Sequence, residues 1–315
     1  MKAGIYTDVD ERAYHGDPCD APSLSSSIIK ILDKESPGHA WWEHPRLRRG
    51  KALELEQSSK TQGMGTVLHK LILGKGRPIK VLNFDNFQTN AAKAARDAAI
   101  EHGETPILAK KMEEAEEVAA AVRPRIAASR VGHLIGPDRG DAEVTGIWQE
   151  NNGIWCRMRL DWLPTVARDG GHITVLDLKT ASQSANAADW QRTMFDFGGD
   201  IQAAFYSRGL KRLIPGVRSV DFVFVVVEQN PPNAVSLCRI SGETFEMASE
   251  TVDAAIKTWG ACLARGTALE HWPFYDDEIT AIDPPIYRKV SAEMRRMRML
   301  NRLAEWQRPT AAAAE

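Results

Sequence analysis

The run Val175-Leu176-Asp177-Leu178-Lys179-Thr180 places one carboxylate and one amine two residues apart in an apolar, strand-like segment. Successive side chains of a β-strand point to opposite faces, so Asp177 and Lys179 share a face. The run Leu160-Asp161-Trp162-Leu163 lies upstream and carries a second acid in another apolar segment. Two acids and a lysine fixed on buried strands can bind a metal ion and orient a water beside it, which predicts metal-dependent cleavage of a phosphodiester.

The sequence around these two runs predicts a sheet. Residues 143–148, 154–161 and 173–179 are expected to form three successive strands, and Asn151-Asn152-Gly153 is a strong hairpin signal between the first two. The nearly apolar run 220–228 predicts a central strand covered on both faces, and residues 234–240 are expected to pair with it. The predicted fold class is therefore α/β, with a mixed central β-sheet flanked by helices and a helical N-terminal part.

Apolar residues at helical spacing predict the helices around this sheet. The polar stretch 51–63 is expected to be a loop, and Gly198-Gly199 is expected to interrupt one of the helices. The expected helices cover residues 24–32, a short segment from Ser36-Pro37, then 65–74, 90–103, 109–129, 190–210, 242–264 and a basic segment after Pro285. We expect an N-terminal extension over 1–22, a main domain over 23–280 (helical part 23–130, catalytic core 140–265), and a basic C-terminal helix and tail over 281–315.

Composition excludes several classes of protein. The chain has 315 residues, is 43% hydrophobic and 26% charged, and carries a net charge of −2, as a soluble globular protein does. Neither an apolar signal core nor a membrane-length apolar segment occurs, so we expect a cytoplasmic protein without a membrane partner. Four scattered cysteines form no Cys-x-x-Cys pair, which argues against a zinc or iron–sulfur site.

The acids and the lysine define the expected chemistry. Magnesium prefers oxygen ligands, which Asp161, Asp177 and the Leu178 backbone carbonyl can supply. Lys179 can position a water or stabilise developing negative charge. An Asp-x-Lys pair on its own is better explained as a surface salt bridge at a strand end, so the assignment depends on the residues that accompany it.

Those accompanying motifs give the chain a family resemblance. In order, they are Gly65-Thr66-Val67-Leu68-His69, Arg159-Leu160-Asp161, Asp177-Leu178-Lys179-Thr180 and Gln202-Ala203-Ala204-Phe205-Tyr206. The chain resembles the PD-(D/E)xK nuclease superfamily. More narrowly, it is similar to RecE-like exonucleases, the exodeoxyribonuclease VIII-like proteins of phages and prophages, which are related to the RecB nuclease domain and lambda exonuclease. The resemblance implies a restriction-endonuclease-like core.

The resemblance also implies roles for individual residues. His69, Asp161 and Asp177 would bind metal, and Lys179 would contact the attacking water or the scissile phosphate. Gln202 and Tyr206, four residues apart on one helix face, would support the site and contact DNA. Without the other motifs, His69 is better explained as a core or surface histidine, and an ordinary helix surface is the alternative for Gln202 and Tyr206.

Further residues are weaker candidates. Glu143 begins the strand before Asp161 and could add a metal ligand or support one. Thr180 could position the strand end or touch a phosphate. The C-terminal basic run, with Arg295, Arg296 and Arg298 as candidate DNA contacts, could instead only solvate a helix face.

The expected cofactor is Mg²⁺, with Mn²⁺ as a possible substitute, and no iron–sulfur cluster or nucleotide cofactor is expected. The expected function is exonucleolytic hydrolysis of linear double-stranded DNA in the 5′-to-3′ direction. The single-stranded product would serve phage-type homologous recombination in a bacterial host. Partners would be duplex DNA ends, a single-strand annealing recombinase and further copies of the chain. The alternatives are a PD-(D/E)xK endonuclease or end-trimming nuclease, and a DNA-binding module without activity.

Overall fold

The computed structural model describes residues 1–48, 60–136, 138–165, 171–275 and 277–306. The chain divides into two compact units, Met1–Phe274 and Tyr275–Glu315. The first unit carries the sheet and all the acids considered above, and the second carries one long helix, α10 (Ile286–Trp306). Within the described residues, no helix combines the length and the apolar content that a bilayer crossing requires.

A six-stranded sheet organises the first unit, which confirms the predicted mixed α/β class. Its spatial order is β1-β4-β5-β6-β7-β8. Only β6 and β7 are parallel, and the other neighbours pair antiparallel. The strands are β1 (Gly4–Tyr6), β4 (Gly140–Gln149), β5 (Trp155–Pro164), β6 (Gly171–Ala181), β7 (Val217–Glu228) and β8 (Val235–Cys238). The turn between β4 and β5 is the predicted hairpin, where Gly153 takes a φ of +84°.

One face of the sheet is covered by helices from both halves of the sequence. Side chains of β6 and β7 such as Val175 and Phe224 pack there against α8 residues such as Phe205. The covering helices are α2 (Ser26–Lys34), α3 (Pro37–Glu43), α7 (Ala187–Asp196), α8 (Gly199–Leu213) and α9 (Gly242–Arg265). The predicted interruption is present, because Gly198 adopts a left-handed conformation between α7 and α8.

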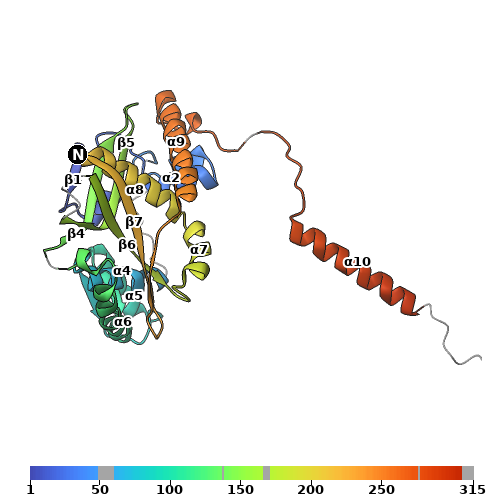
Figure 1. Ribbon diagram of the computed structural model, residues 1–315, viewed down its shortest axis with the longest axis horizontal. Coiled ribbons are helices and arrows are strands. Elements are labelled where there is room, and N and C mark those ends of the chain that lie inside the picture. Colours follow the sequence, from blue (N-terminus) through green and yellow to red (C-terminus); the bar gives the residue numbers. More distant parts are fainter. Residues whose placement is uncertain (49–59, 137, 166–170, 276, 307–315) are drawn as a thin grey trace, which may run out of the picture. The chain divides into compact units, whose positions relative to one another are not determined.

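The other face of the sheet is covered by a smaller helical layer. Leu176 and Leu178 of β6, together with Val225 and Val227 of β7, pack there against α4 and α6, so β7 is buried on both faces as expected. This layer contains α4 (Lys60–Leu73), α5 (Asn90–Glu101), α6 (Ala109–Ala128), the short 3₁₀ helix Gly132–Leu134 and a parallel pair of strands, β2 (Ile79–Leu82) and β3 (Thr105–Leu108). Figure 1 shows α4, α5 and α6 grouped apart from α2, α8 and α9.

Some expected boundaries are wrong. The loop expected over 51–63 is helical from residue 60, where α4 begins, and its residues 51–59 lie outside the described residues. The reason is that the polar start of α4 lacks an apolar face, so its period cannot be seen in sequence. Strands β2 and β3 were not predicted, because four-residue strands give too short a pattern. The end of the expected C-terminal helix and tail, residues 307–315, also lies outside the described part of the chain.

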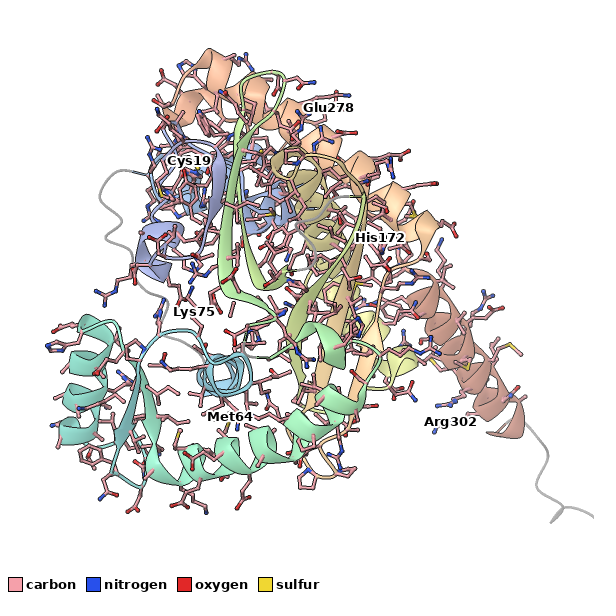
Figure 2. All side chains as sticks on the ribbon, turned by 60° about the vertical axis from the view of Figure 1, so that its left-hand side comes forward. Cys19, Met64, Lys75, His172, Glu278 and Arg302 are labelled. Atoms are coloured by element: carbon pink, nitrogen blue, oxygen red, sulfur yellow. The ribbon has the colours of Figure 1, made fainter. Side chains whose placement is uncertain are left out.

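The segment 1–22 is built into the sheet and does not stand apart from it. Strand β1 pairs with β4, and α1 (Glu11–His15) follows. Arg12 Nη2 donates to the Glu101 carbonyl at 2.9 Å, Lys75 Nζ donates to the Thr7 carbonyl, and Arg77 pairs with Glu11. Lys75 is labelled beside this segment in Figure 2. These contacts fasten the helical layer of α4–α6 to the sheet.

Candidate active site

Three acids face one another across neighbouring strands. Glu143 lies on β4, Asp161 on β5 and Asp177 on β6. The pairs that bracket them in the sheet are Val144↔Leu160, Ala142↔Trp162 and Trp162↔Leu176. Asp161 therefore lies at the same level of the sheet as Glu143 and Asp177, at a point where the regular strand pairing is interrupted. Like charges directly opposite each other repel, so a counter-charge is needed at this level of the sheet.

The strands are irregular at the acids. Residues two apart on a regular strand share a face, yet Ala142 packs in the core on one face and Val144 in the core on the other. The same change of face separates Leu160 from Trp162 in β5. Glu143 has a φ of +56°, which costs a non-glycine residue on the order of 1–3 kcal/mol. Backbone strain of this kind is concentrated at functional sites.

The side chain of Asp161 accepts a hydrogen bond from a backbone N–H of the neighbouring strand β6. Regular pairing of β5 with β6 is confined to Trp162↔Leu176, and beside it the Leu178 N–H donates to Asp161 Oδ2 at 2.8 Å. His69 Nδ1, which α4 brings from the helical layer, lies 3.7 Å from the same oxygen. The Leu178 backbone also interacts with the His69 ring. The predicted metal-binding carbonyl of Leu178 therefore lies beside His69 and Asp161.

His69, Glu143 and Asp161 form a compact donor set. One ligand atom from each lies within 4.8 Å of the others. Two carboxylates and one imidazole are suitable donors for Mg²⁺ or Mn²⁺, with water completing the coordination. In this arrangement Asp177 is directed elsewhere: Gln202 Nε2 donates to Asp177 Oδ1 at 2.9 Å, and Lys179 Nζ pairs with Asp177 Oδ2.

The charges of the site shift the pKa values of its members. Burial and the neighbouring Asp177 hold the pKa of Asp161 well above its ordinary value. Burial and the positive charge of Lys179 lower the pKa of His69, so its imidazole is neutral, the form that binds metal. Burial alone would lower the pKa of Lys179, but Asp177 and Asp161 outweigh it and raise that pKa. Lys179 is therefore a fixed cation.

Gln202 and Tyr206 lie one turn apart on α8, and both are buried. Gln202 donates to Asp177, as described above. Burial and the nearby Asp177 raise the pKa of Tyr206 to about 12, against the effect of a hydrogen bond with Ser26. Gln202 therefore contacts the acid of the Asp-x-Lys pair, while the supporting role of Tyr206 and contact of either residue with DNA stay predictions.

Arg159 is a supporting residue that sequence reasoning did not single out. Its Nε pairs with Glu143 Oε2 at 2.6 Å, and its Nη1 donates to the Val9 carbonyl at 3.1 Å. Tyr14 of α1 is buried against its guanidinium group. The sequence did contain a sign of this role: in β5 the polar side chains at 157, 159 and 161 alternate with apolar ones, so Arg159 is expected on the same face as Asp161. Segment 1–22 thus holds the arginine that orients Glu143.

Replacing Arg159 by Met is expected to weaken metal binding by about 10- to 100-fold, because residues that orient metal ligands typically contribute that much. The measurement is a calorimetric titration of the chelator-treated protein with Mn²⁺. Arg239→Met is the matched control, since it breaks an ion pair with the partly exposed Asp221 and should leave the affinity unchanged. Equal affinities for Arg159→Met and the wild type would remove Arg159 from the site.

The remaining candidates are placed as follows. Thr180 is half-buried and close to α4, since a Cβ built on Gly65 would lie 3.5 Å from its Oγ1. Arg295, Arg296 and Arg298 are exposed on α10 in the second unit. Their role in DNA binding stays a prediction.

An acid on one strand, an Asp-x-Lys pair on the next and a glutamine on a helix further along the chain are the parts of a PD-(D/E)xK nuclease. A family model described as a PDDEXK-like domain of unknown function (DUF3799) matches residues 53–283, more than half of the chain. The chain belongs to this family and is a nuclease-type hydrolase.

Two solved structures were found to be similar to the chain, and the first of them shares its fold. A candidate exonuclease from Eubacterium rectale has a TM-score of 0.52 and 12% identity, over 89% of this chain and 97% of its own. A phage-related exonuclease from Haemophilus somnus 129PT has a TM-score of 0.28 and 15% identity, over 64% of this chain and 94% of its own. No curated protein matches the sequence.

Proposed function

We propose that the protein is a Mg²⁺-dependent DNA exonuclease that hydrolyses linear double-stranded DNA from 5′ ends and leaves single-stranded DNA for phage-type homologous recombination. The observation that carries this proposal is the donor set of His69, Glu143 and Asp161 beside the Asp177–Lys179 pair. The exonuclease descriptions of the structures from E. rectale and H. somnus agree with it. A single-strand annealing protein and further copies of the chain are the proposed partners, in the cytoplasm of a bacterial host.

Each residue of the site has its own role in the proposed reaction. His69, Glu143 and Asp161 would hold Mg²⁺, or Mn²⁺ in its place, with Asp177 and the Leu178 carbonyl as further donors. A bound divalent cation supplies charge to activate water and to shield phosphate and leaving oxygens. Lys179 holds the attacking water or the scissile phosphate, and its raised pKa keeps it charged at neutral pH. Gln202 keeps Asp177 oriented through its hydrogen bond.

Digestion of end-labelled linear duplexes tests the proposal. With Mg²⁺, label at 5′ ends should be released, label at 3′ ends should remain in long single strands, and chelator should stop both. Duplexes with and without a 5′ phosphate show which end is preferred. Cleavage of covalently closed circles would instead indicate an endonuclease, and DNA binding without cleavage under any metal would indicate an inactive binding module.

A further inference from the structure

A second lysine lies beside Lys179. Lys30 Nζ of α2 is 5.6 Å from the centre of the Phe197 ring, and Lys179 Nζ is 5.7 Å from the same centre. Helix α2 packs against α8, which carries Gln202. Two ammonium groups therefore share one aromatic ring next to the acids, although they come from segments about 150 residues apart in the sequence.

The turn between α7 and α8 is shaped to accept Lys30. Gly198 has a φ of +68°, and a Cβ built there would lie 3.0 Å from Lys30 Cγ and 3.1 Å from its Cδ and Cε. A side chain at 198 would therefore be strained by the backbone and would also press on the lysine. The aliphatic stem of Lys30 is half-buried along this glycine, so its ammonium is fixed in direction.

The ammonium of Lys30 has no close counter-ion among the described residues. It makes no ion pair within 4.0 Å with any residue in the described part of the chain, whereas Asp177 is already bound by Lys179 and Gln202. Burial and the charge of Lys179 lower the pKa of Lys30 to about 8, with only partial compensation from Asp177 and Asp200. A half-buried cation held beside another cation favours an anion at that place.

We propose that Lys30 binds a backbone phosphate of the substrate strand, next to the phosphate that Lys179 contacts. The inference rests on the proposed function, since a nucleic-acid strand is the substrate that presents phosphates at regular spacing. It assigns α2 a direct part in holding DNA. Lys30 is a binding residue in this account and takes no part in the chemical step.

Lys30→Met tests the inference, because methionine keeps an unbranched stem along Gly198 and removes the charge. Lys34→Met is the matched control: Lys34 lies one turn further along α2, and its Nζ donates to the Asp196 carbonyl. Binding of a short blunt duplex is measured by fluorescence anisotropy over a range of salt, each variant being made in the non-cleaving Asp161→Asn chain. We expect Lys30→Met to weaken binding about tenfold and to reduce the slope of log K against log salt by about 0.9. Lys30→Arg should retain both.

Cleavage by the same variants in the otherwise unchanged chain completes the test, with a raised KM and an unchanged kcat expected for Lys30→Met. A salt slope equal to that of the parent chain, or an equal loss in Lys34→Met, would overturn the inference and leave the proposed function standing. A wild-type chain that neither binds nor cleaves DNA would overturn both.

Discussion

Asp161→Asn is expected to raise the thermal stability of the metal-free protein while it abolishes cleavage. Asp161 lies on β5, between β4 with Glu143 and β6 with Asp177, and burial together with the charges of both neighbouring acids raises its pKa. Asparagine keeps an oxygen to accept the Leu178 N–H and removes the charge that repels Asp177 and Glu143. Cleavage should fall about a thousandfold or more, because a divalent cation contributes several kcal/mol to such a reaction and each 1.4 kcal/mol is tenfold in rate.

The stability gain should depend on pH with a definite sign. Because the folded-state pKa of Asp161 is raised, the folded wild type binds this proton more tightly than the unfolded chain does. The contribution of Asp161 to stability is therefore largest below the ordinary carboxyl pKa and falls as pH rises toward the folded-state value. The advantage of Asp161→Asn should grow over the same window, reaching at least about 1 kcal/mol, or about 2 °C in Tm.

The measurement is thermal unfolding in chelator across pH, with cleavage assayed in Mg²⁺. Asp253→Asn is the control: this acid is half exposed and pairs with Arg208 at 2.8 Å, so its removal should bring no gain. Added Mg²⁺ should stabilise the wild type more than Asp161→Asn. An Asp161→Asn chain that cleaves DNA at the wild-type rate would eliminate Asp161 as a metal ligand.

The strands that carry the acids could be predicted because their signals are local. Apolar runs around Asp161 and Asp177, and a turn at Asn151-Asn152-Gly153, mark β4, β5 and β6 within about forty residues. The parallel neighbour β7 follows from its nearly continuous apolar composition. Such signals give the existence of strands, and the acids within them, before any tertiary contact is known.

The support of the site could not be predicted, since it depends on contacts between distant segments. Arg159 is held by Val9, and Lys30 shares a ring with Lys179. Nothing in the local sequence of α2 distinguishes Lys30 from Lys34. Lys30 nevertheless lies near Asp177, whereas Lys34 donates a hydrogen bond to the Asp196 carbonyl. Strand β1 was missed for the same reason, because a three-residue strand is defined by its partner.

Charge balance links the acids to the lysine. Three carboxylates face a neutral imidazole and two cations, Lys179 and Arg159, so the site is short of positive charge until a divalent cation binds. Lys179 compensates part of that deficit, since it pairs with Asp177 and its charge opposes the raised pKa of Asp161. A cation and Lys179 therefore have different roles: the lysine stabilises the site before metal binds, and the metal completes the neutralisation.

Because Lys179 and the metal have different roles, Lys179→Ala is expected to impair catalysis without impairing metal binding. Loss of the ammonium removes a fixed positive group at the reacting phosphate, which should lower kcat by about 10²- to 10³-fold. Mn²⁺ affinity, measured by calorimetry, should hold or increase, because a repelling cation is gone from the neighbourhood of His69, Glu143 and Asp161. Lys211→Ala, at the last turn of α8, is the control and should cleave normally.

Unfolding must be separated from the loss of chemistry in this test. Lys179→Ala leaves the carboxylate of Asp177, 2% exposed, without its cation, which should lower the free energy of unfolding in chelator by up to about 3 kcal/mol. The double variant Asp177→Asn with Lys179→Met removes both charges and should recover much of that stability while remaining inactive. A stable Lys179→Ala protein with the wild-type kcat would contradict the PD-(D/E)xK mechanism. Activity that returns in the double variant would instead make Lys179 a structural residue only.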